Sequence, residues 1–443
     1  MRTKFQPNSV FLHRMVRTAH LTARLIASGS LKPKIYFDTI TQIIHDGFFH
    51  GGKNKMNFVM ISPHFPTNFE TFAVRLHEKG INTLGIADAP YESLSENLRQ
   101  SLTEYYRVDN MEDYEQVYRA VAYFAHKYGR IDRIESHNEY WLELDARLRT
   151  DFNVFGYKNP DMLAIKTKAQ MKEVFRKIGL KVAQGQVFYS DDEARALAKR
   201  LKFPVIIKPN SGVGASDTYK IRSAEELEDF FHYQNRHVEY IMEEFIDGDI
   251  ITFDGLTDHD GNIVFYASLE YSEAVLDTVA KDGDMYYFVP RDISPKLVEL
   301  GKQCVQAFNV RERFFHFEFF RVHATGELLP LEINCRPPGG LTIDMWNYAN
   351  DFDVFAEYAN IVRENRFHAN ITHPWNVVYI SRKANQHYVN SIESVCQRFP
   401  LNIISVQQVP GVFAKIMGEH GILARTDTLE NMREIVQFAH QKY

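Results

Sequence analysis

Two glutamates and an asparagine carry the most distinctive chemistry in this sequence. In the apolar segment 315–321 alternate residues point to opposite faces, so Phe315, Phe317 and Phe319 share one face and Glu318 projects from the other, with His316 and Phe320. The segment that follows the next turn places Glu332 and Asn334 on one face, and pairing the two segments as a hairpin brings Glu318 close to Glu332. Two carboxylates and an amide oxygen suit Mg²⁺, whereas two buried carboxylates without a metal would repel each other. The pattern predicts a metal site, with exposed carboxylates on a hairpin as the alternative.

A glycine-containing loop follows a second apolar strand. The strand runs from Phe203 to Lys208, and the loop behind it contains Gly212 and Gly214. Glycine adopts the dihedrals that such a loop needs and leaves backbone amides free to surround phosphate oxygens. No Gly-Lys-Ser or Gly-Lys-Thr occurs there, so the loop is not a Walker loop. Phosphate binding is the prediction, and a flexible hairpin with a solvated lysine is the alternative.

The elements that position these residues begin with a first domain over residues 57–157. Short apolar runs alternate there with amphipathic stretches, which is the rhythm of βαβ units around a parallel sheet. The turn Ser62–Pro66 lacks the three spaced glycines of a dinucleotide fingerprint, which removes the main support for a nicotinamide enzyme. We expect strands over 58–61, 82–87 and 130–135 and helices over 69–79 and 114–128.

A polar segment, Ser136–Glu139, follows the last of these strands. Ligands bind at the carboxyl edge of a parallel sheet, so Asn138 and Glu139 are candidate site residues. A plain helix start explains the same two residues. The sequence leaves both interpretations open.

Size and composition favour small-molecule chemistry. A chain of 443 residues predicts several subdomains, which we place at 56–157, 158–365 and 366–443. Fifty-one basic against 57 acidic residues argue against a nucleic-acid surface, and no apolar run approaches the roughly 20 residues that span a bilayer. The three cysteines are widely spaced, which predicts neither disulfides nor a zinc site and favours a reducing, cytoplasmic location.

Residues 1–55 form an expected N-terminal extension of uncertain role. Residues 1–37 contain seven basic and no acidic residues, which is also the composition of an organelle transit peptide. We favour the extension, because Met56 opens a segment that reads as the first strand of the α/β domain.

Taken in order, these motifs resemble the ATP-grasp superfamily, of the carboxylate-amine ligase type. The resemblance covers about residues 57–365. It includes two further segments, a helical stretch at 161–183 that contains Lys166 and a hinge-like segment at 240–249. It implies an α/β ATP-grasp fold with an N-terminal βαβ domain and a small C-terminal α+β extension. In that family a strand lysine, an upstream lysine and a mobile glycine-rich loop hold the triphosphate.

The resemblance also implies the site residues. The metal ligands are Glu318, Glu332 and Asn334, and Arg336 with Lys208 assists the transferred phosphoryl group. Many members carry a glutamate where this chain has Asp249, so the ribose contact stays open. The implied nucleotide-binding residues are Lys166, Lys208, Ser211, Gly212, Gly214, Ser216, Glu243, Glu244, Phe245, Ile246 and Asp249.

The implied activity is an ATP-dependent ligation with Mg²⁺, or Mn²⁺, as the metal. A carboxylate would be activated as an acyl phosphate and passed to an amine, both being small molecules, with a homodimer as one expectation. A kinase-like or carboxylase-like reaction on the same scaffold, or a nucleotide-binding protein without turnover, are the alternatives. The sequence does not identify either substrate.

Overall fold

The computed structural model describes residues 55–212, 217–271, 283–409, 414–415 and 417–443. The chain divides into two compact units, Met1–Lys55 and Met56–Tyr443, and every element below belongs to the second. The expected extension over residues 1–55 therefore lies outside the described residues, apart from Lys55. Within the described ranges, no helix is both long and apolar enough to cross a membrane.

The first sheet consists of four parallel strands in the order β3-β2-β1-β4. Strand β1 is buried along its whole length, as expected for a parallel strand covered on both faces. Helix α5 begins after Asp113, whose side chain caps its first turn, and ends at Gly129 with φ 93°. The predicted βαβ pattern is confirmed. The elements are β1 (Asn57–Ile61), η1 (Thr67–Phe69), α3 (Glu70–Glu78), β2 (Asn82–Ala87), η2 (Tyr91–Ser93), α4 (Glu96–Ser101), β3 (Glu104–Arg107), α5 (Tyr114–Tyr128), β4 (Arg133–Glu135) and α6 (Leu142–Asp151).

Two helices replace the single helical stretch expected over 161–183. Helix α7 (Asn159–Lys166) ends at Thr167, whose backbone is extended, and α8 (Lys168–Lys177) begins directly afterwards. The N–H groups of the first two residues of α8 donate to the backbone and side-chain oxygens of Asn210, at 2.8 and 3.0 Å. The break is therefore held by a residue at the end of a distant strand, and it separates the lysines on either side.

The second sheet has four antiparallel strands in the order β5-β8-β6-β7, with two amphipathic helices. Their apolar faces form one core with the strands. The elements are β5 (Gly185–Phe188), α9 (Asp191–Leu201), β6 (Val205–Pro209), β7 (Tyr219–Ile221), α10 (Ala224–Tyr233) and β8 (Tyr240–Glu244).

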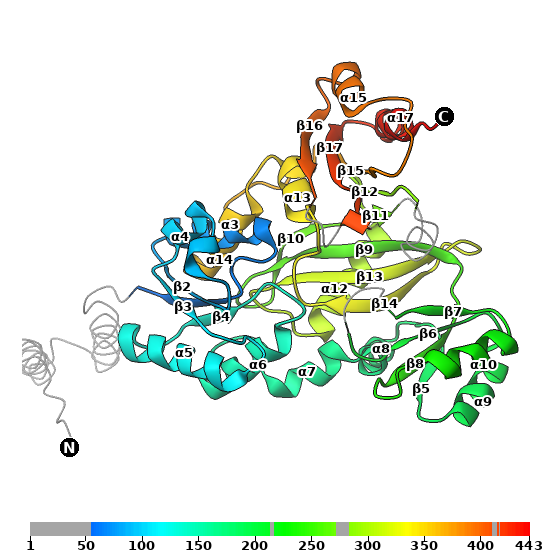
Figure 1. Cartoon of the computed structure of the whole chain (residues 1–443), viewed down its shortest axis with the longest axis horizontal. Coiled ribbons are helices and arrows are strands. Elements are labelled where there is room, and N and C mark those ends of the chain that lie inside the picture. Colours follow the sequence, from blue (N-terminus) through cyan, green and yellow to red (C-terminus); the bar gives the residue numbers. More distant parts are fainter. Residues whose placement is uncertain (1–54, 213–216, 272–282, 410–413, 416) are drawn as a thin grey trace, which may run out of the picture. The chain divides into compact units, whose positions relative to one another are not determined.

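The third sheet has nine strands, eight of them in the order β14-β13-β9-β11-β12-β15-β17-β16, while β10 pairs with β9. The long strands β9, β13 and β14 run side by side (Figure 1). The C-terminal strands continue this sheet, because β15 pairs with β12. Its strands are β9 (Gly248–Thr257), β10 (Ile263–Ala267), β11 (Glu270–Tyr271), β12 (Tyr286–Val289), β13 (Phe314–Val322), β14 (Leu328–Asn334), β15 (Asn376–Arg382), β16 (Ile403–Gln408) and β17 (His420–Thr426), and the accompanying helices are α12 (Pro295–Ala307), α13 (Thr342–Asn350), α14 (Val354–Glu364), α15 (Ile392–Arg398) and α17 (Leu429–His440).

Strand β13 separates an apolar core from a polar face. Phe315, Phe317 and Phe319 are fully buried in the core that also contains residues of α8 and α12. Because side chains alternate along a strand, burial of the three phenylalanines directs His316 and Glu318 to the opposite face. The hydrophobic effect thus orients the candidate site.

Candidate active site

Glu318 and Glu332 lie directly opposite each other on β13 and β14, as the hairpin prediction requires. His316 faces Asn334 one pair farther along the same face. The ladder shifts register immediately after Glu318, at a β-bulge. The amide nitrogen of Asn334 lies 3.5 Å from Oε1 of Glu332. The structure therefore brings the three predicted metal ligands together, while no cluster of three or more His, Cys, Asp and Glu side chains suited to a metal occurs in the described ranges.

A buried chain of hydrogen bonds runs from β9 to Glu318. Nδ1 of His316 lies 2.7 Å from Asp254 Oδ1, and Nε2 lies 3.1 Å from Glu318 Oε1. The hydroxyl of Thr252 donates to the other oxygen of Asp254 at 2.5 Å. Burial alone would lower the pKa of His316, but the charge of Asp254 and the hydrogen bonds to both carboxylates raise it to about 9. An imidazolium that donates to both carboxylates holds Glu318 in one orientation.

Three buried lysines lie among the carboxylates of Glu332 and Glu243. Nζ of Lys168 lies 3.9 Å from Glu332 Oε2, and Nζ of Lys208 lies 3.1 Å from Glu243 Oε2. The other oxygen of Glu243 is 3.1 Å from Nζ of Lys172. Lysine side chains are seldom buried without a nearby anion, and this group combines a strand residue of β6 with two residues of α8. Their clustering creates a positive site beside the Glu318–Glu332 pair.

The pKa values of the site reflect burial and its mixed charges. Burial and then the charge of Glu318 raise the pKa of Glu332 above its ordinary value. Burial would also raise the pKa of Glu318, but His316 lowers it below the ordinary range. Burial would lower the pKa of Lys208, yet Glu243 and the two opposed glutamates raise it. The site therefore holds carboxylates under mutual repulsion, which a bound cation would relieve.

Lys166, the predicted upstream phosphate lysine, has a different neighbourhood. Its Nζ donates to Oε1 of Glu139 at 2.9 Å and to the backbone oxygen of the same residue at 3.1 Å. Lys168, two residues later, is the lysine that approaches Glu332. The break between α7 and α8 accounts for this separation.

The glycine segment and the hinge-like segment are only partly described. Ser211 and Gly212 are exposed, and Gly212 has φ 141°, a conformation that favours glycine. Gly214 and Ser216 lie outside the described residues. In the hinge-like segment Glu243 pairs with lysines, as above. Glu244 accepts a hydrogen bond from the backbone N–H of Gln184 at 2.7 Å, and Nζ of Lys220 lies 3.5 Å from the ring centre of Phe245. Ile246 is half-buried. Asp249 is hydrogen-bonded to His323 at 2.9 Å and to Arg321 at 3.2 Å.

Arg336 follows β14 and meets the first domain. Its Nη1 donates to the oxygen of Pro337 at 2.8 Å, and its Nε lies 4.0 Å from Oε2 of Glu139. Arg336 also contributes to the lowered pKa of Glu318, so its charge acts on the same site. The Ser136–Glu139 segment thus reaches the candidate site, which the sequence had left open.

Four further residues of this site were not predicted from the sequence: Lys168, Lys172, His316 and Asp254. The alternation of β13 does place His316 on the same face as Glu318, so that signal was present. Asp254 gave no signal, because its partner His316 is 62 residues away in the chain.

Comparison with known proteins identifies the domain that contains this site. Residues 201–344 match the model of the ATP-grasp domain. That range includes Lys208, Glu243, Glu318, Glu332 and Asn334. The chain therefore contains an ATP-grasp domain.

Two curated relatives share part of the sequence. The L-arginine-specific L-amino acid ligase of Bacillus subtilis is 27% identical over 248 residues, which is 52% of this chain and 60% of that protein. The carbamoyl-phosphate synthase of Methanobrevibacter smithii is 27% identical over 205 residues, 44% of this chain and 52% of the relative. The chain thus spans little more than half the length of these proteins.

The fold is shared with a solved L-amino acid ligase from Bacillus licheniformis. The two structures superpose with a TM-score of 0.66 at 14% sequence identity, covering 87% of this chain and 97% of that one. The fold is thus the α/β ATP-grasp fold, with a parallel N-terminal sheet and antiparallel grasp sheets.

Proposed function

We propose that this ATP-grasp domain protein is an ATP- and Mg²⁺-dependent ligase that activates a carboxylate as an acyl phosphate and joins it to an amine. The observation that carries the proposal is the pair Glu318 and Glu332, held opposite each other on buried strands beside Lys168 and Lys208. Paired carboxylates next to lysines are the parts that phosphoryl transfer from a metal–nucleotide complex requires.

The donor set fits a hard divalent cation. Glu318 and Glu332 supply carboxylate oxygens from facing positions, and Asn334 supplies an amide oxygen from the same face. Burial and the charge of Glu318 raise the pKa of Glu332, because both destabilise its charged form. A bound cation would stabilise that charged form. Bound there, Mg²⁺ would neutralise charge on the transferring phosphoryl group.

Positioning is the main task of the protein side chains in such a reaction. Lys208 and Lys168 would bind phosphate oxygens, taking the place of the carboxylate contacts they make here. Arg336 would hold the substrate carboxylate, whose oxygen attacks the γ-phosphate to give an acyl phosphate and ADP. The nitrogen of the uncharged amine then attacks the acyl carbon, phosphate leaves with the electrons of the C–O bond, and the surplus proton on nitrogen is released with it.

The relatives support amide-bond formation as the outcome. One curated relative and one solved structure are named as L-amino acid ligases, so amino acids are the first substrates to test. A carboxylase-like reaction is the second candidate, because a solved biotin carboxylase domain with bicarbonate and MgADP shares the fold with a TM-score of 0.61. Bicarbonate would then replace the organic carboxylate.

The test measures Mg²⁺-dependent release of ADP and phosphate with mixtures of the twenty amino acids, and compares the wild type with Glu332→Ala. We expect release that requires amino acids, disappears with EDTA and is lost in the variant. Equal release in both proteins would refute the metal-site assignment. Release that depends on bicarbonate alone would replace the ligase with the carboxylase-like reaction.

A matched control keeps this result specific. Glu327 lies on the turn between the same two strands, pairs with Lys181 on the surface and is exposed. Glu327→Ala removes a carboxylate of the same hairpin, so it should leave turnover within about twofold of the wild type.

A further inference from the structure

Glu139 is a buried carboxylate that the mechanism above does not use. It lies in the loop between β4 and α6, is only 5% exposed, and reaches from the first domain to the residues that follow β14. Its Oε1 accepts a hydrogen bond from Lys166 at 2.9 Å. Its Oε2 is buried and accepts no hydrogen bond from any described residue, and Nε of Arg336 lies 4.0 Å from it.

The unsatisfied oxygen requires a hydrogen-bond donor. Buried polar atoms in proteins are nearly always paired, so an exception at a site points to a ligand that completes it. A phosphate or carboxylate cannot be that ligand, because it would meet the negative charge of Glu139. An ammonium or amine group can, since its N–H groups donate and its charge is attracted.

The surroundings hold Glu139 and Arg336 in a fixed relation. Oε2 of Glu135 pairs with Arg149 at 2.9 Å and with Arg313, and Nη1 of Arg313 donates to the backbone oxygen of Cys335 at 2.9 Å. One buried ion-pair network therefore anchors the strand end before Glu139 and the residue before Arg336. A substrate group bound at Oε2 would lie beside Arg336 with little freedom to move.

A cavity borders this loop at Tyr140 and Trp141, directly after Glu139 in the chain, although Glu139 and Arg336 are not among its lining residues. It has a volume of about 380 Å³ and is lined by Lys166, Ser211 and Gly212 on one side and by Glu112, Tyr140 and Trp141 of the first domain on the other. Cavities of this size hold small metabolites, and the lining combines two aromatic rings with the acidic Glu112 and Glu143 and the basic Lys166.

We propose that Glu139 is the amine-binding residue of the ligase: its Oε2 accepts a hydrogen bond from the ammonium or amine of the incoming nucleophile and places it beside Arg336. This inference rests on the proposed function and adds the site of the second substrate. The first domain then supplies the amine site, whereas the grasp domain supplies the site for nucleotide and metal.

The experiment compares Glu139→Gln with the wild type using two nucleophiles. One is the amino acid that gives the most amide product, and the other is hydroxylamine, which is uncharged at neutral pH and traps acyl phosphates as hydroxamates. In the variant we expect the KM for the amino acid as amine to rise about tenfold or more. The KM for ATP and the rate of hydroxamate formation should stay within about twofold of the wild type.

The outcomes separate this inference from the function it rests on. An unchanged KM for the amine in a folded Glu139→Gln protein would overturn the inference, and so would a parallel loss of amide and hydroxamate, because Glu139 would then serve activation or folding. A wild type that forms no hydroxamate with any of the twenty amino acids would overturn amino acids as the carboxylate substrates of the proposed ligase.

Two further variants control for folding. Glu115→Gln changes an exposed carboxylate in the first turn of α5 and should leave every constant unchanged. If Glu139→Gln does not fold, Glu139→Asp replaces it, because this variant keeps the charge on a side chain that is one methylene shorter. The KM for the amino acid as amine must then rise while the rate of hydroxamate formation stays unchanged.

Discussion

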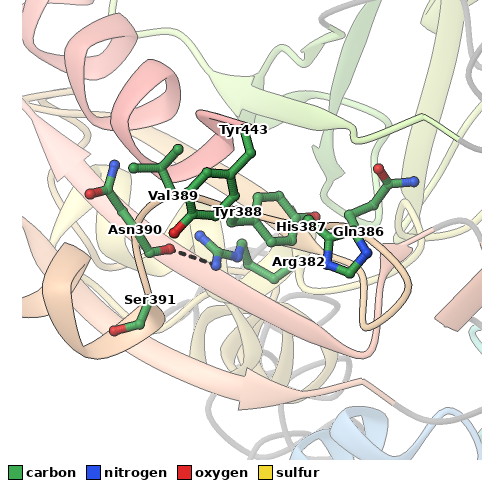
Figure 2. Close-up of a pocket in the computed structure, with 8 residues that line it drawn as sticks. All are labelled: Arg382, Gln386, His387, Tyr388, Val389, Asn390, Ser391 and Tyr443. Atoms are coloured by element: carbon green, nitrogen blue, oxygen red, sulfur yellow. Dashed lines mark hydrogen bonds between the residues drawn. The ribbon is translucent and has the colours of Figure 1, made fainter.

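Two polar regions of this molecule differ in how their charges are satisfied. The C-terminal region has a cavity of about 620 Å³, lined by residues that include Arg382, Tyr388 and Asn390. Figure 2 shows Arg382 beneath the ring of Tyr388, with its hydrogen bond to the Asn390 backbone. The guanidinium also donates to the backbone of Ala439 at 2.6 Å, and the Tyr388 hydroxyl donates to Asp284 at 2.5 Å.

The candidate active site is arranged in the opposite way. Glu318 faces Glu332, and Glu139 keeps a buried oxygen without a hydrogen-bond donor among the described residues. Groups that already satisfy each other stabilise a fold, whereas like charges held together need a ligand. The difference indicates that the balance of charges, rather than the volume of a cavity, marks the functional region. Four predictions test it.

The largest effect is expected from Lys208→Gln. Removal of its charge from beside Glu243 and Glu332 should lower ATP turnover about a hundredfold or more, because a preorganised cationic group would be lost. Steady-state ADP release measures the effect. Lys199→Gln, which changes an exposed lysine, serves as the control. An equal loss of ADP release in both variants would show that the charge at the candidate site has no special role in turnover.

Arg382→Met should affect stability alone. The guanidinium is buried and donates to two backbone oxygens, so its removal should lower the free energy of unfolding by about 3 kcal/mol. Urea unfolding measures this, with the exposed Arg398→Met as the control. ADP release at a temperature where the variant is folded should equal that of the wild type, and a loss there would show that the C-terminal cavity takes part in turnover.

A pH scan tests the loop that carries Glu139. Burial of His137 lowers its pKa to about 4 from an ordinary 6.5, so the unfolded chain binds more protons than the folded one between these values. The free energy of unfolding that depends on a neutral His137 is fully present above pH 6.5 and is lost as the pH falls towards 4. At pH 5 the loss amounts to about 2 kcal/mol.

His137→Asn isolates this contribution. Asparagine tolerates the positive φ of 55° at this position and does not titrate. The fall in melting temperature between pH 7 and pH 5 should therefore be smaller in the variant. An identical fall in both proteins would assign the acid sensitivity to other groups.

The smallest effect is expected from His316→Asn. Its amide can still donate to Asp254 but does not reach Glu318, so Glu318 loses the contact that orients it. The Mg²⁺ concentration that half-saturates binding of a fluorescent ADP analogue should rise about tenfold. His316→Gln keeps an N–H near the position of Nε2 and should recover most of that loss. Equal Mg²⁺ requirements in all three proteins would contradict a positioning role.

Local patterns made much of the fold predictable. Alternation along 315–321 identified β13 and the face that carries Glu318, because burial of three phenylalanines leaves only one orientation for the residues between them. The predicted helix over 114–128 matches the bounds of α5, and in the structure its two ends lie at the local caps Asp113 and Gly129. The facing position of Glu332 followed from the short turn that joins the two strands.

Contacts between distant segments were not predictable in the same way. The choice between Lys166 and Lys168 depends on the break at Thr167, which Asn210 holds from the end of β6. The hydrogen bond between His316 and Asp254 depends on β9 pairing beside β13. Neither arrangement leaves a periodic signal in one stretch of chain.

The sequence by itself determined the main strands and helices of the first domain and which face of β13 is polar, because these depend on side-chain periodicity and on residues within a few positions. Only the tertiary structure decided which lysine approaches Glu332 and that Glu139 meets Arg336. Both contacts bring together segments far apart in the chain, and their geometry results from the packing of the whole unit Met56–Tyr443.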